Sequence, residues 1–177
     1  MKILSKVGLK ISTIGMLIVA ARRSIRLLIA TRVAPLDITP HQYWMLMVLL
    51  KGAPMSLGEL TRAMWMDNPT VSRMVRQMRL RGYLAVGPEP TLGRRIRIRL
   101  TPEGEAFCEQ LTEIGRDFQE NAQKGMSPKE ITGLRAGLCK FMINLDEMVA
   151  SECPGLPIHA QRGHPKPGEH PSRVSVI

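Results

Sequence analysis

The chain has 177 residues, a formal net charge of +10 and only 4% aromatic residues. This length accommodates one domain or two small domains that share a core. So few aromatic side chains argue against a protein that stacks RNA or single-stranded bases on aromatic platforms. No phosphate loop, dinucleotide fingerprint, nucleophile elbow or metal-hydrolase motif is found, so we predict no enzyme, no cofactor and no metal.

The charge is unevenly distributed along the chain. Residues 1–100 carry a net charge of +13, with 17 basic and 4 acidic residues, whereas residues 101–150 carry −4, with 5 basic and 9 acidic residues. A basic front half followed by an acidic half indicates a nucleic-acid face opposed by a surface of another kind.

An apolar stripe predicts a long helix at the N-terminus. Its members recur at alternating steps of four and three residues, typical of a helix seam: Ile14, Ile18, Ala21, Ile25 and Leu28. A competing interpretation is a secretory signal peptide, because three lysines precede the apolar run 11–21. That run is too short to span a bilayer, and the stripe continues beyond it. A helix in a cytoplasmic protein is therefore favoured.

Two capped helices follow in the middle of the chain. Ser56-Leu-Gly-Glu59 is a capping box that opens a helix over Leu57–Met64. Asn68 is the expected N-cap of the next helix, with Pro69 at its first position. This helix covers residues 70–81 and is followed by glycine, as helices often are.

The second of these helices has two distinct faces. Its apolar residues form one narrow stripe that is predicted to pack inward: Val71, Met74, Val75 and Met78. An arginine side chain can form two hydrogen bonds with one guanine, and hydroxyl side chains can form hydrogen bonds with bases or phosphates. The other side of the helix is therefore predicted to read a major groove, through Asn68, Pro69, Thr70, Ser72, Arg73, Arg76 and Gln77.

A β-hairpin is predicted next, with strands over residues 83–86 and 95–100 and a loop over 87–93. Alternation along the second strand directs Ile96, Ile98 and Leu100 to the core and Arg95, Arg97 and Arg99 outward. Three neighbouring cations on one strand repel one another, and this repulsion is tolerable if a polyanion lies alongside. Arg94 follows a glycine and could enter a minor groove. Arg94, Arg95 and Arg97 are thus further candidate DNA contacts.

Two more helices are predicted toward the C-terminus. Thr101 caps a helix that starts at Pro102 and runs to about residue 121, and Ser127-Pro-Lys-Glu130 opens another that ends near residue 150. The last helix carries an apolar stripe: Ile131, Leu134, Leu138, Phe141, Met142, Leu145 and Met148. Because a winged helix does not need such long flanking helices for its own core, they predict a homodimer. Two recognition helices one turn of DNA apart read a palindrome.

The residues described so far resemble the MarR family of winged helix-turn-helix regulators. The resemblance covers about residues 8–150, and the segments that carry it are Ile38–Leu46, Leu57–Thr61, Asn68–Arg73, Arg81–Leu84 and Arg94–Gly104. The chain departs from the family at one place. The family's wing usually holds an aspartate two residues before its minor-groove arginine, whereas this chain has Leu92 there, unless Glu89 substitutes.

The resemblance implies terminal helices that interdigitate with a partner chain, and a small aromatic or anionic effector. The residues that would line an effector site are Met16, Ala20, His41, Trp44, Met45, Phe107 and Leu111. Some relatives sense oxidants through cysteine, so Cys108 or Cys139 could do so here, although helical cysteines are more often ordinary buried residues. The odd number of cysteines, with Cys153 in the tail, fits no zinc spacing.

The predicted fold is mainly α with a small antiparallel β-wing, a winged helix-turn-helix between helices that form a dimerisation domain. The expected regions are an N-terminal dimerisation helix (1–37), the winged domain (38–101), C-terminal dimerisation helices (102–150) and a Pro- and Gly-rich disordered tail (151–177). The predicted function is a dimeric, sequence-specific regulator that represses from a pseudo-palindromic site in double-stranded DNA and responds to an effector. The alternatives are an architectural DNA-binding protein, which would contact phosphates alone, and a redox-sensing regulator.

Overall fold

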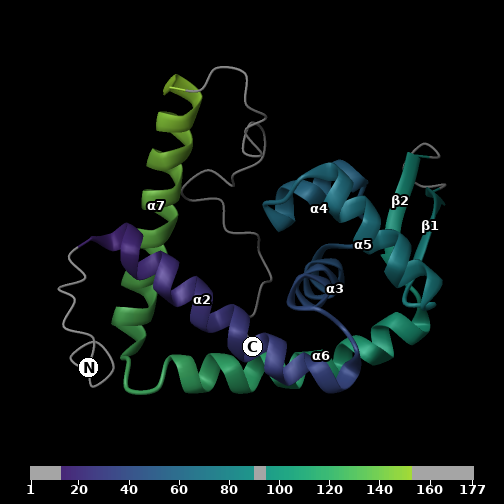
Figure 1. Ribbon diagram of the computed structural model, residues 1–177, viewed down its shortest axis with the longest axis horizontal. Helices are drawn as coiled ribbons and strands as arrows, with labels where there is room; N and C mark the ends of the chain where they lie inside the picture. The colour runs from purple at the N-terminus through teal and green to yellow at the C-terminus, as the bar shows by residue number, and fades with distance from the viewer. Residues whose placement is uncertain (1–12, 90–94, 153–177) are drawn as a thin grey trace. The chain divides into compact units, whose positions relative to one another are not determined.

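The computed structural model describes residues 13–89 and 95–152 of the chain (Figure 1). The elements are α2 (Ile14–Val33), the 3₁₀ turn η1 (Ala34–Leu36), α3 (Pro40–Gly52), α4 (Leu57–Met64), α5 (Asn68–Leu80), β1 (Leu84–Glu89), β2 (Arg95–Leu100), α6 (Pro102–Ala122) and α7 (Pro128–Glu152). This mainly helical order with one two-stranded antiparallel sheet confirms the predicted fold class. The chain divides into two units, Met1–Trp44 and Met45–Ile177.

In the first unit, α2 is one continuous helix. It begins at Thr13, whose hydroxyl accepts a hydrogen bond from the backbone N–H of Met16 at 3.4 Å, and it runs without a break to Val33. Pro35, which cannot continue an α-helix, lies in the tight turn η1 that follows. Most of the apolar side chains along α2 are exposed, and only Ile29 and Val33 are fully buried.

In the second unit, the predicted inward stripe of α5 is confirmed. All of its members are buried: Val71, Met74, Val75 and Met78. α5 contacts α4 and β1, and β2 contacts α6. The remaining buried apolar residues of these elements include Leu60, Leu84, Ile98, Leu100, Phe107 and Leu111. The core therefore holds the polar face of α5 in a fixed orientation.

The capping residues of α4, α6 and α7 act as the sequence predicts. Ser56 and Glu59 form a complete capping box at α4. Thr101 accepts a hydrogen bond from the backbone N–H of Gly104 at 3.0 Å, and Ser127 and Glu130 bond each other reciprocally at the start of α7. These contacts satisfy N–H groups that lack partners within the helix.

The predicted N-cap of α5 is wrong by one residue. The cap is Asp67, whose Oδ1 accepts a hydrogen bond from the backbone N–H of Thr70 at 2.8 Å, while Asn68 and Pro69 are the first two helical residues. Asn68 is engaged elsewhere, because its Oδ1 accepts from the hydroxyl of Thr61 at 2.8 Å. The Asn68 side chain therefore joins α5 to α4 instead of capping α5.

The end of α5 and the hairpin close the winged part of the chain. Gly82 adopts φ +81°, and the backbone N–H groups of Gly82 and Tyr83 donate to the carbonyls of Arg79 and Met78. This is a Schellman motif, which requires a residue in the left-handed conformation. β1 is longer than predicted and pairs with β2 from Leu84 opposite Leu100 to Glu89 opposite Arg95.

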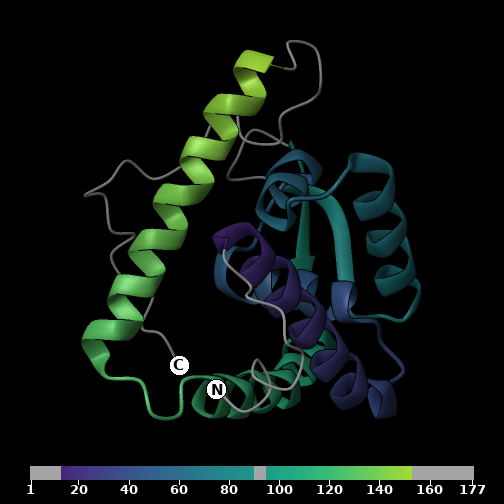
Figure 2. The same ribbon diagram turned by 60° about the vertical axis from the view of Figure 1, so that its left-hand side comes forward.

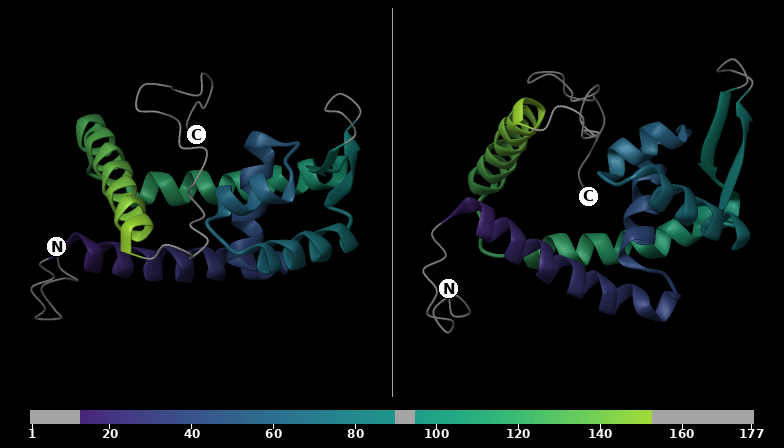
Figure 3. Two further views of the ribbon diagram at one scale, coloured as in Figure 1. Left: turned by 90° about the horizontal axis from the view of Figure 1, so that it is seen from above. Right: turned by 45° about the horizontal axis from the view of Figure 1, so that its top comes forward.

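α7 contrasts with the other helices of the second unit because none of its residues is buried. It follows α6 through a short turn that contains Gly125 at φ +83°, and can be traced in Figures 2 and 3. Several apolar side chains of its predicted stripe are exposed, among them Leu134, Met142, Leu145 and Met148. Within residues 13–89 and 95–152, no helix has both the length and the apolar character needed to cross a membrane.

Candidate nucleic-acid interface

A short turn joins α4 to α5. α4 ends at Trp65, which adopts a left-handed conformation (φ 55°) and donates its backbone N–H back to the last turn of the helix. The turn leads to the Asp67 cap of α5, and the Thr61–Asn68 hydrogen bond holds the two helices together. This arrangement is a helix-turn-helix in which α5 is the second helix.

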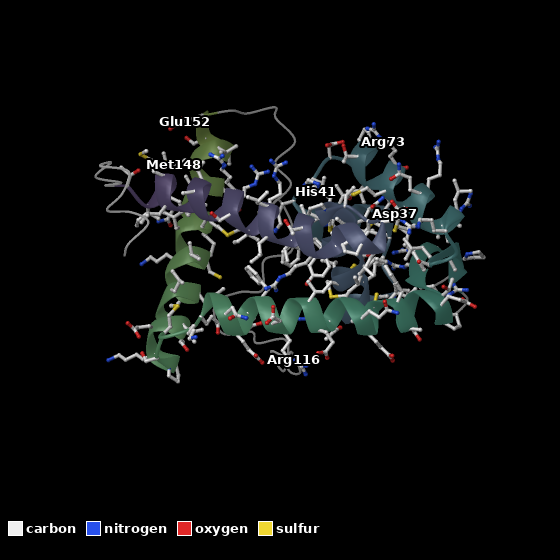
Figure 4. All side chains as sticks on the ribbon, turned by 60° about the horizontal axis from the view of Figure 1, so that its bottom comes forward. Asp37, His41, Arg73, Arg116, Met148 and Glu152 are labelled. Atoms are coloured by element: carbon white, nitrogen blue, oxygen red, sulfur yellow. The ribbon has the colours of Figure 1, made fainter. Side chains whose placement is uncertain are left out.

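The polar face of α5 is presented to solvent, opposite the buried stripe. Arg73 and Arg76 are exposed, and Figure 4 shows Arg73 on the outer side of the helix. Thr70 and Ser72 are half-buried beside them. The structure thus brings together the candidate reading residues on a single face, with Asn68, Pro69 and Gln77 also exposed.

Asp67 lies at the start of this face as the N-cap of α5, although it was not among the residues predicted from the sequence. The hydrogen bond from the Thr70 backbone holds the pKa of the Asp67 carboxyl below its ordinary value, and the charge of Arg73 adds to this effect. The carboxylate occupies the positive end of the α5 dipole. The beginning of α5 therefore presents a negative charge near Arg73. An Asp-x-x-Thr spacing was the signal that could have identified it.

The wing places its arginines differently from the prediction. Arg95 and Arg99 are exposed, as predicted. The outward position predicted for Arg97 is wrong, since its side chain is only 11% exposed and Nη1 donates to Oε2 of Glu59. Alternation along a strand gives the side of the sheet, but a long side chain can still fold back onto a neighbouring helix.

Ile96 also departs from its predicted position. It is 60% exposed instead of packed in the core, whereas Ile98 and Leu100 on the same strand are buried. Ile96 pairs with Pro88 near the far end of the hairpin, while Ile98 also pairs with Met55 nearer its base. The core therefore covers only the proximal half of the wing. Leu92, Arg94 and the side chain of Glu89 lie outside the described part of the structure.

The seven candidate effector residues are divided between the two units. Met16, Ala20, His41 and Trp44 belong to the first unit and are exposed. Met45, Phe107 and Leu111 belong to the second unit and are buried. The Phe107 ring stacks on Tyr83 with 4.4 Å between ring centroids, which makes it a core residue of this unit. The effector site remains a prediction.

The two helical cysteines differ in their surroundings. Burial, with a smaller contribution from the charge of Glu105, raises the pKa of the Cys108 thiol to about 11. Since the thiolate is the reactive form, Cys108 is poorly suited to sense oxidants at neutral pH. Cys139 is exposed on α7. Cys153 lies beyond the described residues.

A helix-turn-helix followed by an antiparallel hairpin, with exposed arginines on both, defines the class of winged helix-turn-helix proteins. The model of the MarR family matches residues 36–95. The multiple antibiotic resistance protein MarR of Salmonella typhimurium is 27% identical over 143 residues, which cover 80% of this chain and 99% of that protein. The HTH-type transcriptional repressor NicR of Pseudomonas putida is 25% identical over 111 residues, 63% of this chain and 70% of NicR.

A solved structure gives the same result. A mutant of MarR from Escherichia coli, complexed with operator DNA, superposes with a TM-score of 0.64 and 27% identity over 75% of this chain and 95% of that one. Sequence and fold thus agree over most of the described residues. Residues 36–95 match the MarR family of transcriptional regulators, and the described chain is similar in sequence and fold to members of that family.

Proposed function

We propose that this protein is a homodimeric, sequence-specific DNA-binding repressor that acts in the cytoplasm. The observation that carries the proposal is the division of α5 into a wholly buried apolar stripe and an exposed face with Arg73 and Arg76. A helix fixed in this way can enter a major groove with its polar side chains in register with base edges. The operator-bound Escherichia coli relative and the repressor NicR support this function.

The terminal helices support the homodimer. In α2 and α7, large apolar side chains are exposed within one chain, including Leu17, Val19, Leu27, Leu134 and Met148. Apolar surface of this extent is unfavourable in water and marks an interaction site. The second copy of the chain is the proposed partner, and it would present the same stripes in return.

A small aromatic or anionic effector completes the proposal. The support is the match of residues 36–95 to the MarR family, together with the exposed apolar and polar side chains of the first unit, Met16, His41 and Trp44. Methionine side chains adapt easily to ligands of irregular shape. Binding of such a ligand would change operator affinity only if it bound the DNA-competent and DNA-free forms with different affinities.

Selection of genomic DNA fragments tests the central proposal. The purified full-length chain is incubated with sheared genomic DNA at physiological salt, and bound fragments are sequenced and then footprinted. We expect enrichment of a few pseudo-palindromic sites, each protected over two half-sites one helical turn apart. Small aromatic acids are then screened for release of the best site.

Two other results would overturn the proposal in different ways. Uniform retention of fragments with no preferred footprint would indicate an architectural protein that contacts phosphates and bent DNA alone. A footprint over a single half-site, bound by a protein of monomer mass, would support sequence recognition but contradict the proposed homodimer.

A further inference from the structure

The side chain of Arg97 is placed differently from those of the other arginines of its strand. Of the three arginines in β2, Arg95 and Arg99 are exposed, whereas Arg97 is folded back against the beginning of α4. Its Nη1 donates to Glu59, while its buried Nε makes no hydrogen bond within the described residues. Burying a guanidinium with one donor unsatisfied is unfavourable. The Arg97 side chain, 11% exposed beside a Glu59 side chain that is 44% exposed, therefore takes a position that strand alternation does not require.

Glu59 is held in place at the other end of this pair. Its Oε2 accepts hydrogen bonds from the backbone N–H and the hydroxyl of Ser56, each at 2.7 Å, in addition to the bond from Arg97. The Ser56 bonds and, to a smaller extent, Arg97 hold the pKa of the Glu59 carboxyl below its ordinary value. The carboxylate is thus charged and fixed at neutral pH.

The backbone beside this pair is joined as well. Met55, directly before the α4 cap, exchanges two hydrogen bonds with Ile98 of β2, at 3.0 and 2.7 Å. Consecutive residues of β2 are therefore attached to the start of α4, Arg97 through its side chain and Ile98 through its backbone. α4 is bonded in turn to α5 through Thr61 and Asn68. A continuous set of contacts runs from the wing to the helix that reads DNA.

We propose that Glu59 and Arg97 are a positioning pair that fixes the direction of the wing relative to α5, and that Arg97 is not itself a DNA contact. The distal half of the hairpin, where Ile96 is exposed, has little core to hold it. Its orientation therefore depends on the attachment at its base. The inference rests on the proposed DNA-binding function.

The variant Glu59→Gln separates this proposal from simple electrostatics. Glutamine retains the capping box but loses the ionic partner of Arg97. Removal of a negative charge from a basic DNA-binding protein should by itself strengthen binding. A positioning role instead predicts that affinity for a duplex selected by the wild-type chain falls about tenfold, within the range of pairwise couplings.

Two further variants, Arg97→Met and the double variant, complete a double-mutant cycle. Arg97→Met should cause a similar loss, and the double variant should be no weaker than either single one, because both remove the same interaction. The slope of affinity against salt should not change, since no phosphate contact is lost. The matched control is Glu113→Gln, which breaks an exposed ion pair with Arg116 on α6 and should leave affinity unchanged or slightly higher.

Amide hydrogen exchange of the free protein gives a second readout. If the pair holds the wing, the Met55 and Ile98 amides should exchange faster in Glu59→Gln, while the global unfolding midpoint changes little. Binding by Glu59→Gln that equals or exceeds wild-type binding would overturn the proposal. So would a salt slope reduced by Arg97→Met alone, which would make Arg97 a direct contact.

The two proposals can fail separately. If the wild-type chain selects no DNA site, the proposed function fails, and the exchange of Met55 and Ile98 still decides whether the pair holds the wing. If Glu59→Gln does not fold, Arg97→Met leaves the capping box intact and carries the same comparison, with unchanged affinity and unchanged exchange as the contradicting result.

Discussion

At the scale of single residues, the exposed arginines of α5 differ in role from the arginine folded back in the wing. Arg73 and Arg76 do not contribute to the packing of the core, because they lie opposite the buried stripe. Arg97 is the reverse case, a largely covered cation that interacts with a helix of its own chain. Exposure and partner, not charge alone, determine what each arginine can do.

We expect Arg73→Ala and Arg76→Ala each to weaken binding to a selected operator by about 1–3 kcal/mol, the cost of losing a bidentate base contact. Binding to random duplex should fall less, because phosphate contacts remain. Fluorescence anisotropy with both duplexes at fixed salt measures the difference. Arg116→Ala on α6 is the control and should leave both affinities unchanged. Equal losses on both duplexes would show that the two arginines touch only phosphate.

Gly104 is a residue whose lack of a side chain is required by packing. A Cβ at this position would lie 2.1 Å from the carbonyl oxygen of Tyr83, which is backbone and cannot move aside as a side chain can. We expect Gly104→Ala to destabilise the fold by about 1–3 kcal/mol, as overpacking does. Thermal or urea unfolding measures the change.

The matched control for that substitution lies on α7. A Cβ at Gly137 would meet no atom within 4 Å, so Gly137→Ala should leave stability unchanged or raise it by about 0.5–1 kcal/mol through helix propensity. Loss of stability in both variants to the same extent would mean that the contact with Tyr83 is not the cause.

At the scale of elements, local sequence signals predicted most helix starts. Capping boxes and threonine caps act over three or four residues, so the beginnings of α4, α6 and α7 could be predicted from sequence. Features set by distant partners could not. The bond between Asn68 and Thr61 and the packing of Arg97 against Glu59, 38 residues away, are two such features. Alternation and periodicity contain no such information.

The carboxylates that cap helices also predict a dependence of stability on pH. Hydrogen bonds from backbone N–H groups lower the folded-state pKa values of Glu59, Asp67 and Glu130. A lowered folded pKa gives a contribution that is present above the unfolded pKa, about 4, and is lost as pH falls through the folded value. The unfolding temperature should therefore decrease as pH falls below about 5.

The variant Asp67→Asn isolates one of these groups. Asparagine is an equally good N-cap but does not titrate, so the variant should show a shallower dependence on pH than wild type. Thermal unfolding at several pH values between about 3 and 7 makes the comparison. If the unfolding temperature depends on pH in the same way in both proteins, Asp67 does not contribute to the dependence.

At the scale of the whole molecule, the terminal helices present the main apolar surface that the described chain leaves uncovered. If α2 and α7 form the proposed dimer, Ile18→Asp and Leu138→Asp should give monomers or unfolded chain, because a buried unpaired carboxylate costs several kcal/mol. Mass measurement by light scattering tests this outcome. Lys140→Asp, at an exposed position of α7, introduces the same carboxylate and should remain dimeric. An unchanged dimer mass in both apolar variants would place the interface elsewhere.

The absence of any buried residue in α7 has a consequence for how the protein would respond to its own abundance. An isolated helix in water is only marginally stable, so the order of α7 would depend on association and therefore on protomer concentration. At protomer concentrations below the dimer dissociation constant, operator occupancy would rise with the square of concentration instead of linearly. A small decrease in synthesis would then release the operator sharply, even with no effector present.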